Sequence, residues 1–275
     1  MRRGLAPSRE EAQRLIAAGR VTVGGAPAAK SARQVDAAES VQVAGPPARY
    51  VGRGGLKLEH ALAAFSLDVT GLRALDAGAS TGGFTDCLLQ HGAAHVLAVD
   101  VGRAQLHARL LDDPRVESLE QTDVRRLDVA EHGGAVDLVA ADLSFISLRV
   151  VLDALLGAVH EGGDLVLLVK PQFEAGRAEV SKGKGVVRDP EVWRSVLDAT
   201  IDAVLSHGAT IMGAVPSPLT GADGNVELLL HVHEGSVAPP PVLDLDGTIA
   251  SAAAIAGIDL GPQLDEEAPA PGEEA

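Results

Sequence analysis

Residues 72–84 read Leu-Arg-Ala-Leu-Asp-Ala-Gly-Ala-Ser-Thr-Gly-Gly-Phe, and this stretch decides the fold. Its apolar part, Leu72–Ala77, predicts a buried strand, and the spacing of Phe84–Gln90 predicts a helix directly after the glycine-rich turn. Glycines at a strand-to-helix turn let the backbone approach a ligand closely. The turn matches neither the dinucleotide fingerprint G-x-G-x-x-G nor a phosphate-binding loop that ends in Gly-Lys-Ser/Thr. We therefore expect a ligand site of another kind at this turn.

Strands and helices continue to alternate beyond this stretch. Further strands are predicted at 94–100, 116–119, 136–142 and 164–170, and helices at 104–111, 148–159 and 190–207. Two more β-rich segments, 209–215 and 226–232, have the composition to pair antiparallel. Apolar strands that alternate with helices indicate a parallel sheet covered on both faces. The sequence thus predicts a doubly wound, Rossmann-like α/β domain over residues 58–235.

Charge is distributed unevenly along the 275 residues, whose net charge is −15. Residues 1–57 hold 10 Lys/Arg against 4 Asp/Glu, whereas residues 236–275 hold 8 Asp/Glu and no Lys/Arg. Such asymmetry indicates a basic binding module attached to a separate body. The segment 236–275 is rich in Pro, Ala, Gly, Asp and Glu, and we expect a disordered acidic tail there, with one weak helix within 244–260.

Composition excludes several classes of protein. The single cysteine, Cys87, rules out a disulfide framework and a multi-cysteine metal site within one chain. Its place beside leucines in a predicted helix indicates a core thiol. No apolar run reaches the length of a membrane-spanning helix, and no apolar stretch follows Met1-Arg2-Arg3 as a signal peptide would require. We expect a cytoplasmic protein with neither a membrane nor a metal partner.

The basic segment 1–47 is predicted to form a small α+β module. Ser8 and Glu11 have the spacing of a helix capping box, Val21–Val23 predicts a strand, and Gly24-Gly25 indicates a tight hairpin. The segment resembles the αL RNA-binding motif of ribosomal protein S4. The residues that carry this resemblance are Arg3-Gly4-Leu5, Ser8-Arg9, Ala12, Leu15-Ile16, Gly19, Val21–Val23, Gly25 and Lys30.

This resemblance implies that lysines and arginines of the module face RNA phosphates. The motif normally begins with a further helical turn ahead of Gly4, so we expect that the module is truncated or that its start codon is misassigned. A glycine-rich connector, 48–57, is predicted to join the module to the body. The expected RNA-binding residues are Arg2, Arg3, Arg9, Arg14, Arg20, Lys30, Arg33, Arg49 and Arg53.

A second resemblance comes from the glycine-rich turn together with two acidic residues. Asp100 ends the next predicted strand, where a carboxylate can accept from ribose hydroxyls, and Asp123 follows the third strand. The arrangement resembles the S-adenosylmethionine site of class I methyltransferases. It implies S-adenosyl-L-methionine as the cofactor, with Asp123 near its adenine. The expected cofactor-binding residues are Asp76, Gly78, Ala79, Ser80, Thr81, Gly82, Gly83, Phe84, Asp100 and Asp123.

The kind of methyl acceptor is indicated by motifs that are missing and by charged residues that are present. The Asn/Asp-Pro-Pro-Tyr/Phe motif of many N-methyltransferases is missing, and Cys87 has no Pro-Cys context suited to cytosine C5 chemistry. Charged residues instead stand at predicted strand ends and before the first helix of the body: Lys57, Asp142, Lys170 and Glu227. A ribose 2′-hydroxyl is a very weak acid. It needs a nearby base or cation when it attacks a methyl group, and these residues supply both without a metal.

With their flanking residues, these motifs are similar to those of the TlyA family, in which an αL RNA-binding motif precedes an FtsJ-like methyltransferase domain. The resemblance covers about residues 2–233. It implies 2′-O-methylation of cytidine in 16S and, in some members, 23S ribosomal RNA, with ribosomal subunits as partners. The segments that carry it are 53–58, 75–85, 141–148, 169–174 and 224–227.

The family's Lys-Asp-Lys-Glu tetrad corresponds here to Lys57, Asp142, Lys170 and Glu227. The resemblance implies that Lys170 is the base or the stabiliser of the alkoxide. It further implies that Lys57 positions the 2′-hydroxyl, while Asp142 and Glu227 orient the lysines.

Three alternatives stay open at this point. The chain can be an FtsJ-like enzyme with another RNA target. It can be an RNA-binding protein without activity, although the complete glycine turn and tetrad argue against this. It can be a haemolysin, a name often given to this family, although the sequence has no strong cationic amphipathic helix beyond the RNA module.

Overall fold

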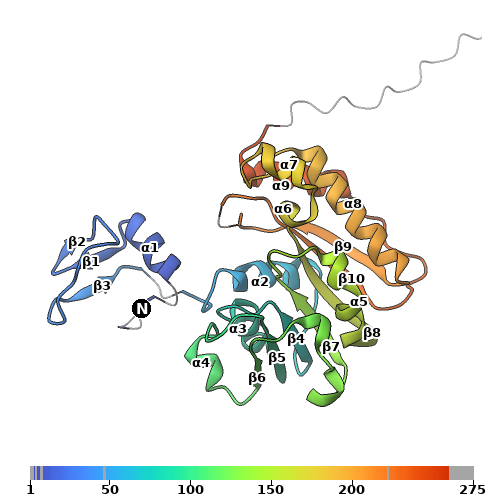
Figure 1. The fold of residues 1–275 in the computed structure, drawn as a ribbon, viewed down its shortest axis with the longest axis horizontal. Coiled ribbons are helices and arrows are strands. Elements are labelled where there is room, and N and C mark those ends of the chain that lie inside the picture. The colour runs from blue at the N-terminus through green and yellow to red at the C-terminus, as the bar shows by residue number, and fades with distance from the viewer. Residues whose placement is uncertain (1–2, 4, 7–8, 46–47, 222, 260–275) are drawn as a thin grey trace, which may run out of the picture.

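A seven-stranded sheet lies at the centre of the computed structural model, in the order β6-β5-β4-β7-β8-β10-β9 (Figure 1). The structure describes residues 3, 5–6, 9–45, 48–221 and 223–259. Strands β6 to β8 pair in parallel, and β10 runs antiparallel to both of its neighbours. This is the doubly wound α/β sheet that the sequence predicts. The strands are β4 Arg73–Ala77, β5 His95–Val99, β6 Val116–Leu119, β7 Val136–Ala141, β8 Val159–Val169, β9 Thr210–Pro216 and β10 Leu228–His233.

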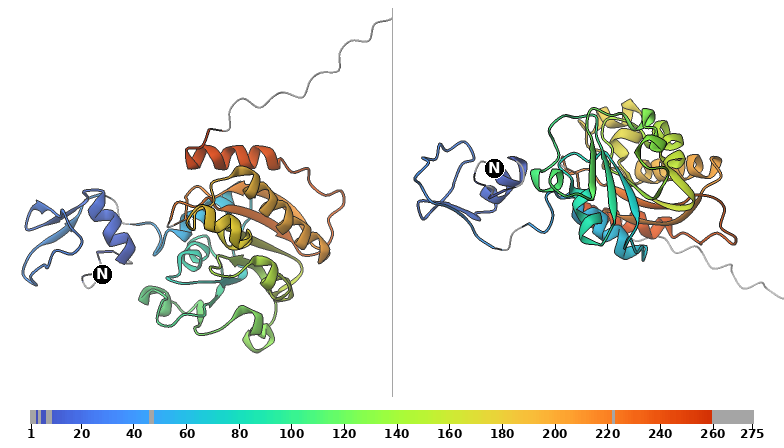
Figure 2. Two further views of the ribbon diagram at one scale, coloured as in Figure 1. Left: turned by 45° about the horizontal axis from the view of Figure 1, so that its top comes forward. Right: turned by 90° about the horizontal axis from the view of Figure 1, so that it is seen from below.

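Helices cover both faces of the sheet (Figures 1 and 2). Helices α2, α3 and α4 contribute to the hydrophobic core on one face, and α5, α8 and α9 to the core on the other. The helices are α2 Gly54–Ala64, α3 Gly83–Gln90, α4 Ala108–Leu111, α5 Leu148–Ala158, α6 Pro171–Glu174, α7 Arg177–Lys182, α8 Pro190–Ser206 and α9 Leu245–Ala256, with short 3-10 helices η1 Val124–Arg126 and η2 Val129–His132.

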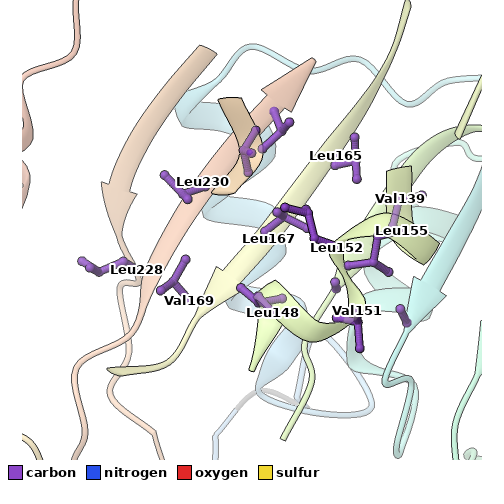
Figure 3. Packing of buried hydrophobic residues seen from close by; sticks show 14 of the residues in the cluster. Val139, Leu148, Val151, Leu152, Leu155, Leu165, Leu167, Val169, Leu228 and Leu230 are labelled. Carbon is purple, nitrogen blue, oxygen red and sulfur yellow. The ribbon is translucent and has the colours of Figure 1, made fainter. Parts of the chain in front are cut away.

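Side chains along the strands alternate between the two cores. In β4, Leu75 packs in the core of α5 and α8, whereas Ala74 packs in the core of α2 and α3. In β8, Leu167 and Leu168 divide in the same way. Figure 3 shows the core of α5 and α8, where Leu152 and other residues of α5 lie against β7, β8 and β10. Because both faces are covered, the strands are apolar almost throughout, as in other buried parallel sheets.

The strand register brings the ends of the central strands to one edge of the sheet. Ala77 pairs with Val99 on one side and with Ala141 on the other, and Val169 pairs with Leu228. Residues that follow β4, β5, β7 and β8 therefore lie along the same edge. Because β10 is antiparallel, the residues that precede it lie there too.

The N-terminal module has its own three-stranded sheet, in the order β2-β1-β3. Gly24 and Gly25 have φ of 60° and 84°, and this left-handed conformation closes the hairpin that the sequence predicts. The predicted cap residue Ser8 lies outside the described residues. The elements are α1 Arg9–Ala17, β1 Val21–Val23, β2 Ala26–Pro27 and β3 Val41–Val43, and the buried core consists of Ala6, Leu15, Val21, Val23 and Ala28.

Three element boundaries differ from the predictions by four or five residues, because tertiary contacts override local sequence. Helix α2 begins at Gly54 rather than at Leu58, so Lys57 lies inside it. Helix α4 begins only at Ala108, after the cap residue His107. Strand β8 begins at Val159 rather than at residue 164. Backbone hydrogen bonds of Gly162 and Gly163 with Glu234 extend its pairing through a glycine-containing segment that sequence alone does not favour as a strand.

The segment after residue 236 contains one helix. The weak helix expected within 244–260 forms as α9 and packs against α8 and β9. Ile249 and Ala252 are buried in the core, and Thr248 donates to the carbonyl oxygen of Ala214 at 3.0 Å. Residues 260–275 lie outside the described residues.

Two expectations from composition can be compared with the structure. Cys87 is fully buried beside α2 and β5, which confirms a core thiol, and burial raises its pKa to about 12. Within the described ranges, no helix has both the length and the apolar character needed to cross a membrane.

The packing of α9 predicts that a charge at its buried face destabilises the whole domain. Ala252 is 1% exposed, so Ala252→Asp should lower the free energy of unfolding by about 3 kcal/mol, since an unpaired carboxylate cannot be buried without loss. Ala254→Asp places the same charge on the exposed face of the same helix and is the control. Urea denaturation measures both. Equal small effects would mean that α9 does not belong to the cooperative core.

Candidate functional site

The glycine-rich turn after β4 is shaped by residues with left-handed backbone. Gly78 and Gly82 have φ of 89° and 95°, and Ser80 between them has φ of 48°. A Cβ atom on Gly78 would lie 2.6 Å from the carbonyl oxygen of Asp142, and one on Gly82 would overlap the side chain of Leu110. Only glycine fits at these two positions, and the turn can therefore follow β4 closely without blocking the edge of the sheet.

Asp100, directly after β5, fastens this turn from the neighbouring strand. Its Oδ2 accepts the backbone N–H of Ser80 at 2.8 Å, and its Oδ1 accepts the N–H of Gly102 at 2.6 Å. Each carboxylate oxygen keeps a further lone pair for a ligand hydroxyl. The carboxylate thus shapes the turn and still faces the space beside it.

A cavity of about 460 Å³ lies next to the turn. Its volume is within the range of small-molecule sites. Hydrogen bonds from Arg125 lower the pKa of Asp123 to about 2, so this wall residue is an ionised acceptor. An apolar slot, two carboxylates able to accept from hydroxyl or amino groups, and a close glycine backbone fit a nucleoside such as that of S-adenosylmethionine. The lining includes Gly78, Ser80, Asp100, Asp123, Asp142 and Leu143–Ile146.

A second cavity of about 410 Å³ lies on the other side of the same turn. It shares Gly78, Ser80 and Asp142 with the first cavity. The two cavities therefore meet at Asp142. The second cavity is lined by residues 48–54, Leu56, Lys57, Gly78–Thr81, Gly83, Phe84 and Asp142.

Asp76 is placed differently from the prediction that it contacts the cofactor. It lies beneath the turn, fully buried, where its Oδ2 accepts the backbone N–H of Thr85 at 2.8 Å and the Thr85 hydroxyl at 2.6 Å. Burial raises the pKa of Asp76 to about 7. Neither Asp76 nor Gly82 appears in the walls of the two cavities. The other predicted cofactor residues line one cavity or both.

The four predicted tetrad residues come together where the cavities meet. Lys170 Nζ lies 2.5 Å from Asp142 Oδ1 and donates to the Ser144 hydroxyl at 3.0 Å. Lys57 forms an ion pair with Glu227. Asp142 and Lys170 follow adjacent parallel strands, Glu227 precedes antiparallel β10, and Lys57 comes from α2. The fold thus brings together residues that are far apart in sequence.

Both ion pairs are largely withdrawn from water. Lys57, Lys170 and Glu227 are buried, whereas the Asp142 side chain is 21% exposed towards the cavities. Burial raises the pKa of Glu227, while the Lys57 charge beside it acts in the opposite direction. Buried pairs of this kind contribute little net stability, because desolvation offsets the attraction. Their position beside two cavities points to chemistry rather than to stability.

Sequence reasoning missed another buried carboxylate, Glu174. Its Oε2 accepts the Ser147 hydroxyl at 2.5 Å and its Oε1 accepts the backbone N–H of Leu148 at 2.6 Å. These bonds join the segment after Lys170 to the loop that begins at Asp142. Glu174 occurs in the motif at 169–174 that supports the family resemblance, but nothing local shows that its partners lie 26 and 27 residues away.

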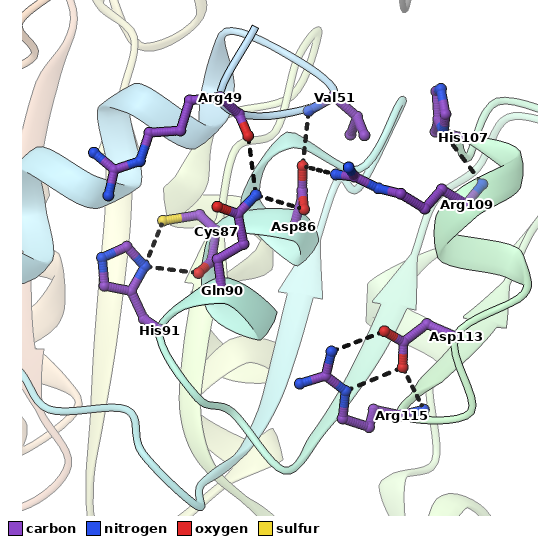
Figure 4. A network of polar contacts seen from close by, with 10 residues as sticks. All are labelled: Arg49, Val51, Asp86, Cys87, Gln90, His91, His107, Arg109, Asp113 and Arg115. Atoms are coloured by element: carbon purple, nitrogen blue, oxygen red, sulfur yellow. Dashed lines mark hydrogen bonds and ion pairs between the residues drawn. The ribbon is translucent and has the colours of Figure 1, made fainter. Parts of the chain in front are cut away.

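The segment predicted as a connector between the two domains is held against the body from Arg49 onwards. Figure 4 shows that Asp86 of α3 accepts the backbone N–H of Val51 at 2.8 Å and the Arg109 guanidinium at 2.7 Å. Gln90 donates both to the Arg49 carbonyl oxygen and to Asp86, at 2.9 and 3.0 Å. Tyr50 and Val51 are buried in the core of α2 and α3. This packing fixes one wall of the second cavity.

Several predicted RNA-binding cations of the module hold its own loops. Arg3 donates to the carbonyl oxygens of Asp36, Ala37 and Glu39 at 2.8, 3.1 and 2.5 Å. Arg33 pairs with Glu39 at 2.7 Å. Arg20 Nε donates to the Ala44 carbonyl oxygen at 2.7 Å.

The other predicted RNA-binding cations divide into three groups. Lys30 is exposed on the module. Arg49, which pairs with Glu59, and Arg53 line the second cavity. Arg2 and the side chains of Arg9 and Arg14 lie outside the described part of the chain.

Comparison with known proteins gives a consistent result. The family model described as FtsJ-like methyltransferase matches residues 50–233, and the S4 domain model matches residues 2–41. The chain is 51% identical over 232 residues to the 16S/23S rRNA (cytidine-2′-O)-methyltransferase TlyA of Mycobacterium tuberculosis, covering 84% of this chain and 86% of that protein.

A second relative and a solved structure carry another name. Hemolysin A of Brachyspira hyodysenteriae is 38% identical over 229 residues, covering 83% of this chain and 95% of that protein. A solved structure from Streptococcus thermophilus, provisionally named a hemolysin, is 40% identical with a TM-score of 0.75, covering 93% of this chain and 92% of that chain.

The burial of Asp76 predicts a pH-dependent stability. Its pKa is about 7 in the folded protein against an ordinary 3.8, so the folded state holds the proton more tightly than the unfolded state. The resulting stabilisation is complete below pH 3.8 and is lost as the pH rises through 7. From about pH 5 to 8, the wild type should lose roughly 2.5 kcal/mol of unfolding free energy relative to Asp76→Asn.

Urea denaturation at several pH values measures this difference. Asp68→Asn is the control, because Asp68 is exposed and hydrogen bonds from Thr70 lower its pKa, away from this pH range. If Asp76→Asn and Asp68→Asn showed the same constant offset from the wild type, Asp76 would not titrate as its burial implies.

Proposed function

The chain belongs to the TlyA family of FtsJ-like methyltransferases, and from this membership we propose that it methylates the ribose 2′-oxygen of a cytidine in ribosomal RNA. It is an S-adenosylmethionine-dependent RNA methyltransferase. The proposed targets are 16S and 23S ribosomal RNA, as the name of the Mycobacterium tuberculosis relative says of that protein. The observation that carries the proposal is the convergence of two lysine–carboxylate pairs where two cavities meet.

The first cavity supports S-adenosylmethionine as the cofactor. Asp100 and Asp123 offer acceptors for the ribose hydroxyls and the adenine amino group, and the glycine turn lets the backbone come close. When bound, S-adenosylmethionine supplies an electrophilic methyl group on a sulfonium sulfur. Asp142, which borders both cavities, marks the place where an acceptor from the second cavity would meet that methyl group.

The tetrad provides what a ribose hydroxyl needs in order to react. As the 2′-oxygen forms its new bond to carbon, the bond between methyl and sulfur breaks and the sulfur keeps the electron pair. Lys170 serves the 2′-oxygen in one of two ways. It takes the proton on a neutral Nζ, or it stabilises the alkoxide as an ammonium while the proton passes to solvent. Asp142 orients Lys170, and Glu227 orients Lys57, which holds the 2′-hydroxyl in place.

RNA binding is assigned to the S4 domain and to the mouth of the second cavity. The body carries a net negative charge, so binding must depend on local cations such as Lys30, Arg49 and Arg53. A nucleotide inside a folded RNA must be flipped out to reach the tetrad, which takes a few kcal/mol. Phe145 is exposed beside the first cavity and offers an aromatic face to a flipped base.

The proposal predicts transfer of label from radioactive S-adenosylmethionine to 30S or 50S subunits that lack endogenous methylation. Lys170→Ala and Asp142→Asn should each lower the single-turnover rate by at least about 100-fold, because each removes a group that acts on the 2′-oxygen or its partner. Asp137→Asn is the control, since Asp137 lies in the same strand β7 but at its other end.

Mapping the label decides the outcome. Label on a cytidine 2′-oxygen that is lost in both tetrad variants and kept in Asp137→Asn supports the proposal. Label on a base, or equal rates in Asp142→Asn and the wild type, contradicts it. Label in RNA other than the two ribosomal RNAs would keep the enzyme class and change the target.

Phosphate contacts predict a steep dependence of RNA affinity on salt. If about five phosphates are neutralised, the logarithm of the association constant should fall with the logarithm of salt concentration with a slope near −4. Fluorescence anisotropy with labelled ribosomal RNA fragments at a series of KCl concentrations measures the slope. A flat response would exclude binding through these cations.

A further inference from the structure

The body of the protein has one short segment with an unusual charge. Residues 58–235 hold 13 Lys/Arg against 26 Asp/Glu. The segment 177–188 alone holds Arg177, Lys182, Lys184 and Arg188 against Glu179. Nearly a third of the basic residues of the body are therefore concentrated in a segment that begins shortly after Lys170. Concentrated cations on an acidic body mark a surface for a polyanion.

Buried side chains fix the end of this segment, loop 183–188. Asn225 is 2% exposed; its Nδ2 donates to the Gly185 carbonyl oxygen at 3.0 Å, and its Oδ1 accepts the N–H of Val187 at 2.9 Å. The indole of Trp193 donates to the Val187 carbonyl oxygen at 3.0 Å. Two buried polar side chains thus hold the backbone of a surface loop in one place, although loops usually move more than the elements they connect.

The same anchor ties the loop to the tetrad. Asn225 stands two residues before Glu227, and the segment 171–182 connects the loop to Lys170 through α6 and α7. Figure 1 shows α6 and α7 near each other in the same part of the molecule. Loop 183–188 is therefore held near the edge of the sheet where the reaction is proposed to occur.

The loop presents its charges to solvent. Lys184 and Arg188 are exposed, and no ion pair or hydrogen bond of either side chain is found within the described residues. Lys184 has φ of 52° between Gly183 and Gly185, and a Cβ on Gly183 would overlap the carbonyl oxygen of Val186. Lys182 is also exposed and pairs with Glu179 at 2.6 Å.

The surroundings do not suit a small anion. The groove beside α7 has a volume of about 530 Å³, and its charged lining is mostly acidic. A phosphate ion there would meet Glu174, Glu179, Asp189 and Glu191 as well as Arg149 and Lys182. Lys184 and Arg188 lie outside the lining of this groove, on the open surface. Fixed, exposed cations outside a pocket fit an extended chain of phosphates rather than a single ligand.

We propose that Lys184 and Arg188 form a second RNA-contact surface, which binds the sugar–phosphate backbone next to the target nucleotide. The inference rests on the proposed function and adds to it a contact on the methyltransferase body. In this proposal RNA is held at two places, by the S4 domain and by this surface. Backbone contacts of this kind position the substrate and carry no sequence information.

Charge-removing variants test the surface because they leave the fold and the tetrad unchanged. Lys184→Gln combined with Arg188→Gln should weaken binding of ribosomal RNA about 10-fold at moderate salt and reduce the salt slope by about 2. The KM for RNA should rise in parallel, while kcat at saturating RNA and the Kd for S-adenosylmethionine stay within about twofold. Lys184→Glu should weaken RNA binding more than Lys184→Gln.

Arg115→Gln is the control. Arg115 is an exposed cation that precedes β6 and so lies at the edge of the sheet opposite the one that carries Asp142 and Lys170. It should leave the RNA affinity and the salt slope unchanged. Equal slopes and affinities in the double variant and the wild type would overturn the inference. Binding and methyl transfer are measured separately. If the double variant shows the expected loss of affinity and of salt slope but the wild type transfers no methyl group, the result contradicts the proposed reaction and still supports the surface.

Discussion

The ion pair between Lys170 and Asp142 depends on the register of two adjacent parallel strands. β7 and β8 pair so that Ala141 lies opposite Leu167, and the residues just beyond the strand ends can then meet at 2.5 Å between Nζ and Oδ1. A slip by one residue would turn every side chain of a strand to the opposite face and separate the pair. The two apolar cores prevent such a slip, because alternate residues of each strand are committed to different helices. The position of Lys170 beside Asp142 therefore depends on the packing of the helices on both faces of the sheet.

The charges at this edge weaken the fold rather than support it. Lys57, Lys170, Glu174, Glu227 and Asp76 are all buried, and desolvation opposes each ionised form. Burial raises the pKa of Glu227 and Asp76, and both shifts reflect the cost of removing a carboxylate from water. The structure tolerates these groups because a large apolar core stabilises the rest of the domain. A concentration of buried charge in one place, where two cavities meet, is the arrangement expected of a catalytic centre.

Polar side chains are used repeatedly to hold loops in position around the site. Asp100 holds the glycine turn, Asp86 holds the segment that enters α2, Glu174 holds the loop after Asp142, and Asn225 holds the loop 183–188. In each case a side chain on a regular element or next to one binds the backbone of a segment far away in sequence. Buried backbone groups must find partners, and these side chains supply them where no strand is available. The site consequently has walls that are set before any ligand arrives.

The sequence by itself determined the order of the two domains, the alternation of strands and helices, the glycine turn and the motifs that contain Lys57, Asp142, Lys170 and Glu227. These features are local, since they depend on hydrophobic period, on turn residues and on motifs that can be read within about ten positions. The tertiary structure alone decided that α9 completes the core, that the segment after Arg49 belongs to the body, and which carboxylates are left for a ligand. Asp76 stands with Asp100 among the expected cofactor-binding residues, yet it lies beneath the turn and binds Thr85. Such distinctions depend on which distant residues meet across the sheet, and no local pattern contains that information.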